Sequence, residues 1–433
     1  MRRRPDAGTP ALVTSTETTE AAGRPARAAA LDILHAALAA RAGLEGGLAH
    51  PSVRALEPRD RAFARALAMA TLRHLGAIDA ALQARLKKPP PERVVNILRI
   101  GAAQLFVLKT PPHAAVAATV DLAPKSFTGL VNAVLRGLTR EPPDLATPEL
   151  LAPQWLYARW MSAYGAETAR AIAAQIGEEP PTDLSLKPGV APEGLEGEVL
   201  PGGSFRAAMA GDVTGWPGFA EGRWWVQDAS AAVPARLLAV GPGETALDLC
   251  AAPGGKTLQL AADGAQVVAV DRNGQRLKRL RENLRRTGLA AEVVEADAAD
   301  WKDGRTFDAV LLDAPCSATG TFRRHPDVLW VASPKDVANL AAVQSRLLDS
   351  AARRVRPGGR LVYCVCSLEP EEGEAQAAAF LSRTPGFALE PVAAGEGGAP
   401  EASLRADGTL RILPQHRPGG TDGFYIARFR RAG

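Results

Sequence analysis

All four cysteines of this 433-residue chain lie between positions 250 and 366, and two stand in short motifs suited to attack on a pyrimidine. Cys316 lies in Asp313–Ser317 (DAPCS), directly after the apolar run Phe307–Leu312. Cys366 lies in Leu361–Ser367 (LVYCVCS). A thiolate that adds to carbon 6 of a cytosine makes the ring an enamine, whose carbon 5 can attack a methyl sulfonium. The two motifs therefore predict methyl transfer onto carbon 5 of a cytosine.

The chemistry requires one attacking thiol but does not say which cysteine supplies it. Asp313, acting as an acid at ring nitrogen 3, would favour the addition. After methyl transfer a base must remove the carbon-5 proton so that the thiol can leave. Cys316 and Cys366 both follow strand-like runs and both remain candidates. Cys250 and Cys364 are interpreted as small buried hydrophobic residues in strands.

A glycine loop upstream, Cys250–Lys256 (CAAPGGK), predicts a cofactor site. Pro253-Gly254-Gly255 lets the backbone approach a ligand closely, and a helix beginning near Lys256 offers free amide groups. The G-x-G-x-x-G of nicotinamide-binding folds is absent. Gly255-Lys256-Thr257 fits the end of a P-loop, but position 250 is cysteine where the P-loop has glycine.

Three aspartates at the ends of successive strand-like runs complete this predicted cofactor site, called the cradle below. Asp271 is placed to hold the two ribose hydroxyls, as in dinucleotide folds. Asp297 suits an adenine amino group, and Asp313 lies within reach of the cofactor's methionine part and the target base. A single Asp after a strand is a common turn residue. Three of them beyond a glycine loop predict S-adenosylmethionine.

Composition excludes several classes of protein. Hydrophobic residues make up 46% of the chain, enough for a large core. No apolar run reaches the roughly 20 residues of a membrane span, and no secretory signal is visible. Four cysteines are no disulfide framework, and no histidine pair stands at metal-ligand spacing with cysteine. We expect a cytoplasmic, monomeric protein with reduced thiols, no metal and no membrane contact.

Charge is unevenly distributed. Residues 24–140 contain 17 Lys and Arg against 7 Asp and Glu, a net of +10. Residues 1–23 balance at 3 each, so the total of +4 leaves −6 for residues 141–433. A basic first domain suggests a nucleic-acid partner, and the alternative is an arginine-rich solubilising surface.

The pattern divides the chain into four parts: a disordered tail over 1–23, a helical domain over 24–142, an α+β segment over 143–235 and an α/β domain over 236–433. Two apolar stripes at helical spacing mark the second part: Val94, Ile97, Leu98, Gly101, Leu105 and Leu108, then Phe127, Leu130, Val131, Val134, Leu135 and Leu138. The aromatic residues Trp155, Tyr157, Trp160 and Tyr164 are interpreted as core, with base stacking as the alternative.

Strands and helices alternate in the last part, which predicts a parallel sheet with helices on both faces. The expected strands are Thr245–Leu249, Gln266–Asp271, Glu292–Ala296, Ala309–Asp313 and Arg360–Cys364, with Phe424–Phe429 as a closing edge strand. Short strands are also expected at Asp183–Leu186 and Arg223–Val226, and helices at Arg276–Arg286 and Lys335–Val355.

These motifs together carry a family resemblance. Asp248–Thr257, Asp313–Gly320, Arg323–Asp327 and Cys366–Glu372 resemble the RNA cytosine-5 methyltransferases of the Sun/NOL family. Ala62–Thr71 and Asn132–Leu135 resemble the NusB-like module of the bacterial 16S ribosomal RNA enzymes of that family, and Trp155–Gly165 and Val226–Ser230 match their middle region. The similarity covers nearly all of residues 25–433.

The resemblance implies a multidomain architecture: an all-α NusB-like bundle, a small α+β middle domain, and an α/β Rossmann-like domain with a seven-stranded methyltransferase sheet. It implies Cys366 as the nucleophile, Cys316 in product release, Asp313 in base activation and Lys256 in support. The implied cofactor contacts are Cys250, Ala251, Ala252, Pro253, Gly254, Gly255, Lys256, Asp271, Asp297 and Asp313. The implied partner is 16S ribosomal RNA. The chain departs from the family at Val365, usually Thr, and at Gly373, usually Asn.

Three alternatives stay open on the sequence. A transfer-RNA cytosine-5 methyltransferase is opposed by the NusB-like domain. A NusB-type RNA-binding or antitermination factor with an inactive second half is opposed by the intact cysteines and aspartates. A P-loop ATPase is opposed by Cys250.

Overall fold

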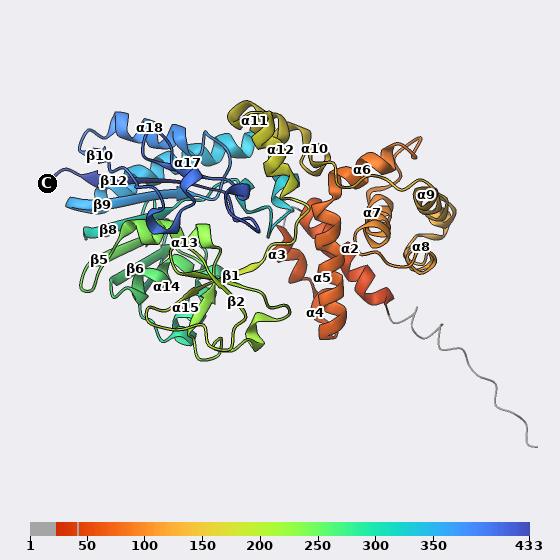
Figure 1. Cartoon of the computed structure of the whole chain (residues 1–433), viewed down its shortest axis with the longest axis horizontal. Coiled ribbons are helices and arrows are strands. Elements are labelled where there is room, and N and C mark those ends of the chain that lie inside the picture. The colour runs from red at the N-terminus through yellow and green to blue at the C-terminus, as the bar shows by residue number, and fades with distance from the viewer. Residues whose placement is uncertain (1–22, 41–42) are drawn as a thin grey trace, which may run out of the picture. The chain divides into compact units, whose positions relative to one another are not determined.

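The computed structural model describes residues 23–40 and 43–433, so all but one residue of the expected tail lies outside the described residues. The chain divides into two compact units, Met1–Leu151 and Ala152–Gly433. Figure 1 shows the elements of both units.

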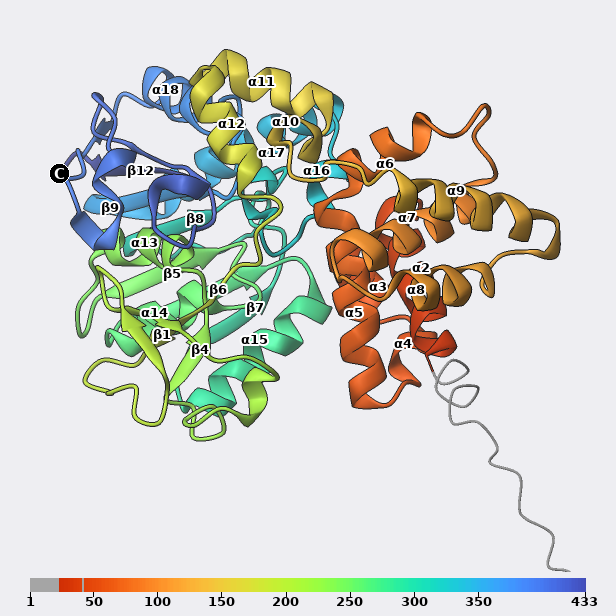
Figure 2. The same ribbon diagram turned by 45° about the vertical axis from the view of Figure 1, so that its right-hand side comes forward.

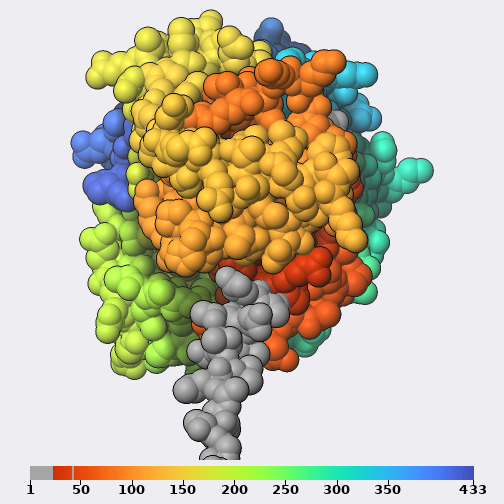
Figure 3. Space-filling view, turned by 90° about the vertical axis from the view of Figure 1, so that its right-hand side faces the viewer, coloured from red at the N-terminus to blue at the C-terminus, as the bar shows by residue number. Residues whose placement is uncertain are grey.

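The first unit is helical, as predicted. Its described helices are α2 (Arg24–Leu38), α3 (Gly43–Leu48), α4 (Pro51–Arg54), α5 (Pro58–Arg73), α6 (Leu75–Gln83), α7 (Glu92–Phe106), α8 (Pro112–Val120), α9 (Thr128–Arg140) and α10 (Pro148–Leu151). The space-filling view shows the unit from the side of α8 and α9 (Figure 3). The two predicted stripes are largely buried and lie on α7 and α9, except that Leu108 follows α7 and Phe127 directly precedes α9.

Gly101 explains how closely these helices pack. A Cβ at Gly101 of α7 would stand 2.8 Å from a Leu135 methyl of α9 and 2.9 Å from the Thr119 methyl of α8. Only a residue without a side chain allows three helices to meet at this point.

The second unit begins with α11 (Gln154–Tyr164), α12 (Ala166–Ala174) and an antiparallel sheet in the order β2-β3-β1-β4. Its strands are β1 (Thr182–Leu186), β2 (Gly197–Val199), β3 (Ser204–Ala207) and β4 (Trp224–Val226). Trp160 of α11 is fully buried. Arg206 of β3 donates to Asp183 of β1 at 2.8 Å and to the Gly420 carbonyl at 2.9 Å, which fixes this sheet to the loop before the last strand.

The main sheet runs β10-β12-β9-β8-β5-β6-β7, with β11 paired to the start of β12. Its strands are β5 (Thr245–Leu249), β6 (Gln266–Asp271), β7 (Glu292–Glu295), β8 (Phe307–Asp313), β9 (Val355–Val365), β10 (Phe387–Leu389), β11 (Leu410–Ile412) and β12 (Phe424–Arg431). Strands β5 to β9 are parallel, whereas β12 is antiparallel to β9 and β10. The predicted seven-stranded α/β sheet is confirmed.

One sequence-based expectation about this sheet is wrong. The last strand, expected at an edge, lies between β9 and β10 and is hydrogen-bonded on both sides. Its residues from Phe424 to Phe429 are all buried. A strand that inserts antiparallel between two others has no local sequence pattern that distinguishes it from an edge strand.

Helices cover both faces of the sheet (Figure 2). One face packs against α13 (Ala229–Leu238), α14 (Gly255–Ala262) and α15 (Gly274–Thr287), and the other against α17 (Pro334–Arg354) and α18 (Glu374–Arg383). A short helix, α16 (Val328–Val331), precedes α17. Burial on both faces explains why these strands read as continuous apolar runs. In the described residues no helix has the length and apolar character needed to cross a membrane.

Candidate active site

The carboxyl ends of the parallel strands gather the predicted residues at one edge of the sheet. Strands β8 and β9 are neighbours, with Asp313 directly opposite Cys364 in their register. The loop after β8 carries Cys316, and Cys366 directly follows β9. The two loops are also joined by the Gly320 N–H, which donates to the Cys366 carbonyl at 3.0 Å. Residues some fifty positions apart, Cys316 and Cys366, thus become neighbours because their strands pair.

The glycine loop connects β5 to α14 as expected. Gly254 stands at the N-cap of α14 with φ +109°, and a Cβ there would lie 2.9 Å from Leu280 of α15. Cys250 was expected inside a strand, and this is wrong: β5 ends at Leu249, and Cys250 takes φ +63° in the turn. The reversal of the chain toward α14 begins at this residue.

Asp271 ends β6 and is buried beneath the loop. Its Oδ2 accepts a hydrogen bond from the Ala252 N–H at 3.1 Å, and its Oδ1 accepts one from the Asn273 N–H at 2.8 Å. An open groove of about 630 Å³ lies beside it, lined by Arg272, Asn273, Gly274, Gln275, Lys278, Arg281 and Glu295. The carboxylate therefore ties the glycine loop to the end of β6, next to the residues that line this groove.

Asp297 is placed differently from the other two aspartates. It lies two residues beyond the end of β7, is exposed, and its Oδ1 accepts from the Ala299 N–H at 2.9 Å. Its side chain caps a turn at the same edge of the sheet.

Lys256 and Asp313 form an ion pair at the centre of the site. The Lys256 Nζ donates to Asp313 Oδ2 at 2.8 Å and lies 5.3 Å from the centre of the Phe424 ring. Burial opposes the charge on this lysine, but the Asp313 carboxylate outweighs it, and the pKa of Lys256 is raised. The Cys364 thiol also donates to Asp313, at 3.4 Å. Cys364 is fully buried, as expected, and burial raises the pKa of its thiol.

The two candidate thiols lie side by side, with 3.5 Å between the Cys316 and Cys366 sulfurs. Both residues are half-buried. Their hydrogen bond, followed by desolvation, raises the pKa of the Cys316 thiol well above its usual value. Two thiols this close can act in turn on the same small ring.

Sequence reasoning assigned no role to Asp248, which lies in β5 below the glycine loop. It is fully buried, and Thr257 donates to its Oδ2 at 2.6 Å, while Oδ1 has no hydrogen-bond partner among the described residues. Burial raises the pKa of Asp248 to about 7. The cradle thus contains an acceptor that the described chain leaves unused.

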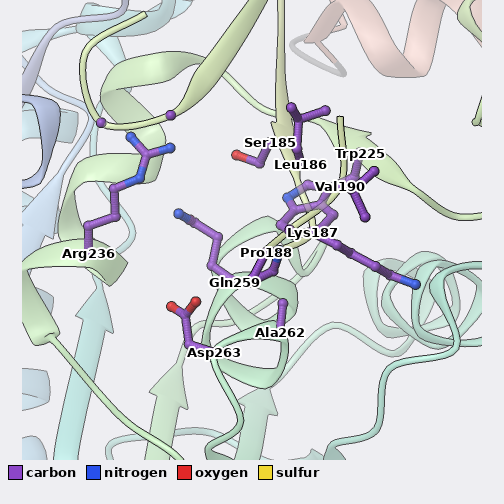
Figure 4. A pocket seen from close by; sticks show the side chains of 13 residues that line it. Ser185, Leu186, Lys187, Pro188, Val190, Trp225, Arg236, Gln259, Ala262 and Asp263 are labelled. Carbon is purple, nitrogen blue, oxygen red and sulfur yellow. The ribbon is translucent and has the colours of Figure 1, made fainter. Parts of the chain in front are cut away.

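Within the described residues no group of three His, Cys, Asp or Glu side chains is arranged to hold a metal ion. A cavity of about 320 Å³ lies between β1 and the helices α13 and α14, where Gln259, Asp263 and Arg236 contribute side chains (Figure 4). It contains none of the predicted catalytic or cofactor residues.

Comparison with known proteins finds a matching family in each unit. Residues 235–430 match the family described as 16S rRNA methyltransferase RsmB/F, and residues 24–140 match the NusB family. A ribosomal RNA small subunit methyltransferase B from Pseudomonas syringae pv. tomato is 38% identical, over 93% of this chain and 96% of that protein. The protein of the same name from Xanthomonas campestris pv. campestris is also 38% identical, over 96% and 99%.

Solved structures show the same fold. The crystal structure of PH0851 has a TM-score of 0.76 at 23% identity and covers 94% of this chain and 99% of that one. The structure of NSun6 from Pyrococcus horikoshii with SFG has a TM-score of 0.55 at 21% identity, over 65% and 98%. With 38% identity over nearly its whole length, the chain belongs to the ribosomal RNA small subunit methyltransferase B family, which confirms the predicted resemblance.

Proposed function

We propose that the protein methylates carbon 5 of a cytosine in 16S ribosomal RNA, with S-adenosylmethionine as methyl donor and a covalent cysteine–cytosine intermediate. The observation that carries this proposal is the pair of thiols 3.5 Å apart beside the Lys256–Asp313 ion pair. Family membership supports the substrate.

The cradle fits such a cofactor. A Cβ at Gly254 would displace Leu280 and one at Gly255 would crowd Gln227, so the tight turn of this loop favours glycine at both positions. Asp271 is a buried carboxylate beside an open groove, suited to ribose hydroxyls. When bound, the cofactor supplies an electrophilic methyl group. We assign the loop from Cys250 to Lys256, with Asp271, Asp297 and Asp313, to its binding.

In the proposed mechanism the Cys366 thiolate forms a bond to carbon 6 of the cytosine. Ring nitrogen 3 becomes more basic as that bond forms. The charged pair of the Lys256 ammonium and the Asp313 carboxylate can hold a proton against this nitrogen. Carbon 5 then carries the new methyl group and its original proton. Cys316, after its own thiol proton has passed to solvent, takes that proton as a base. The electrons of the carbon 5–hydrogen bond restore the carbon 5–carbon 6 double bond, and the carbon 6–sulfur bond breaks to release Cys366 as a thiolate. The raised pKa of Cys316 keeps its thiol protonated at neutral pH, so this step requires prior loss of that proton, after which the thiolate is a strong base.

The helical unit is assigned to RNA binding. Its net charge of +10 over residues 24–140, against −6 for residues 141–433, supports a polyanionic partner on this part of the chain. We propose residues 24–142 as the RNA-binding domain, 143–235 as a linker and RNA-binding subdomain, and 236–433 as the catalytic domain. We further propose that the enzyme works as a monomer in the cytoplasm.

Substitution of each thiol tests the mechanism. Cys366→Ala should abolish methylation and form no protein–RNA adduct. Cys316→Ala should add to the base and transfer the methyl group, then stall as a complex that survives denaturing electrophoresis and disappears with ribonuclease. The double variant should show no adduct. An adduct in Cys366→Ala and none in Cys316→Ala would reverse the two roles, and unmodified 16S RNA with the native protein would refute the proposed function.

A further inference from the structure

Glu372 has a contact pattern that the proposed mechanism does not use. It is fully buried and lies in the loop between β9 and α18. Among the described residues its carboxylate has no ion-pair partner. A buried carboxylate without a cation is costly unless hydrogen bonds satisfy it, so the donors around Glu372 indicate what it does.

Those donors come from both cysteine loops. The Ser317 N–H donates to Glu372 Oε1 at 2.9 Å, and the Ser317 hydroxyl donates to Oε2. The Ser367 hydroxyl donates to the same Oε2 at 2.6 Å. Ser317 directly follows Cys316 and Ser367 directly follows Cys366. One carboxylate therefore bridges the residues that come next after the two thiols.

Helix α17 also holds the Glu372 carboxylate, through one of its side chains. Gln344 of α17 donates through Nε2 to Glu372 Oε1 at 3.0 Å and to the Pro315 carbonyl at 2.9 Å. Pro315 directly precedes Cys316, so Cys316 is held on both sides. The Tyr363 hydroxyl donates to the Glu372 carbonyl at 2.5 Å, which anchors the glutamate's own backbone to β9.

We infer that Glu372 is a positioning residue that holds the Cys316 and Cys366 loops together and so sets the separation of the two thiols. Among the described residues it makes no hydrogen bond to either sulfur, although its charge adds to the Cys366 hydrogen bond and the burial that raise the pKa of the Cys316 thiol. It acts through Ser317 and Ser367, whose hydroxyls are also 3.1 Å apart. This inference rests on the proposed function only for its effect on methylation; its effect on the thiol pair stands by itself.

The chemistry explains why a carboxylate is needed. Four donors from Ser317, Ser367 and Gln344 converge on two oxygens, and only an ionised carboxylate accepts at both. A glutamine keeps the shape but turns one oxygen into an N–H₂ donor that faces donors. The serine hydroxyls must then turn away, and the two loops lose the carboxylate link next to the thiols, while the Gly320–Cys366 backbone hydrogen bond remains.

The test uses full-length Glu372→Gln, with Glu371→Gln as the matched control. Glu371 is the adjacent carboxylate of the same loop, but it is half-exposed and pairs with Arg159 at 2.6 Å instead of accepting from Ser317 or Ser367. The first readout needs neither RNA nor cofactor. Peroxide converts the two thiols and one H₂O₂ into a disulfide and two waters, and mass spectrometry of the peptides follows the rate.

Glu372→Gln should slow Cys316–Cys366 disulfide formation by about tenfold or more, the factor that corresponds to 1.4 kcal/mol. Methylation should fall by a similar factor, and the RNA adduct should accumulate because Cys316 no longer meets the ring. Cofactor affinity should stay unchanged. Disulfide and methylation rates equal to those of Glu371→Gln would overturn the inference.

A double-mutant cycle keeps the test decisive if Glu372→Gln folds poorly. Ser367→Ala and Ser317→Ala each remove one donor and leave the carboxylate satisfied by the others. Both should slow disulfide formation, and each should add little to Glu372→Gln because they break the same link. Serine variants with the native disulfide rate would refute the bridge. If the variants slow disulfide formation as expected but the native protein does not methylate RNA, only the proposed function is refuted.

Discussion

Asp271 is expected to stabilise the fold and bind the cofactor at once, and Asp271→Asn separates the two effects. Its two oxygens accept from the Asn273 and Ala252 N–H groups, at 2.8 and 3.1 Å. Asparagine keeps one acceptor and presents an N–H₂ to the other donor. Losing one hydrogen bond to a buried charge costs about 1.5–3 kcal/mol. At about 2–4 °C per kcal/mol for a unit of this size, Tm should fall by roughly 3–12 °C without cofactor.

The loss of the pair to the ribose hydroxyls should add a separate effect on binding. A further 1.5–3 kcal/mol corresponds to a Kd for S-adenosylmethionine raised by roughly one to two powers of ten. Thermal unfolding gives the first quantity and titration calorimetry at a temperature where the variant is folded gives the second. Asp300→Asn, at an exposed aspartate near the same edge, is the control and should change neither. A lowered Tm with unchanged cofactor affinity would mean that Asp271 only braces the loop.

The remaining predictions concern pH and RNA. Burial raises the pKa of Asp248 from 3.8 to about 7, so the folded state holds a proton that the unfolded chain loses. The contribution of Asp248 to the free energy of unfolding should therefore become increasingly unfavourable as pH rises from about 4 to about 7. Asp248→Asn should flatten the dependence of stability on pH in that window, as measured by urea unfolding. Arg59 and Arg65 are exposed on α5, and replacing each by Gln should reduce the salt slope of RNA binding by about 0.7 per residue. An unchanged slope in a filter-binding titration would remove α5 from the RNA surface.

Much of the sheet could be predicted because each central strand is buried on both faces. Thr245–Leu249 and Gln266–Asp271 match β5 and β6 residue for residue. The position of β12 between β9 and β10 could not be predicted, because pairing across the sheet depends on partners distant in sequence. Asp297 was expected at a strand end, but it lies in a turn because β7 stops two residues earlier.

The same limit applies to the candidate site. Residue types and spacing indicated Cys316, Cys366 and Asp313, and the structure places the three at one edge. The Lys256–Asp313 ion pair and the Glu372 bridge had no such signal. Each joins segments more than fifty residues apart, through side chains that are ordinary in their own stretch of sequence.

The register of β8 against β9 has a consequence for how this protein can be monitored. Asp313 faces Cys364, and a slip of one residue would turn every side chain of a strand to the opposite face of the sheet. The thiols following these strands should therefore meet in the native register and separate in any neighbouring one. Their disulfide formation is then a built-in reporter of sheet assembly, readable in crude extracts during refolding and without any RNA substrate.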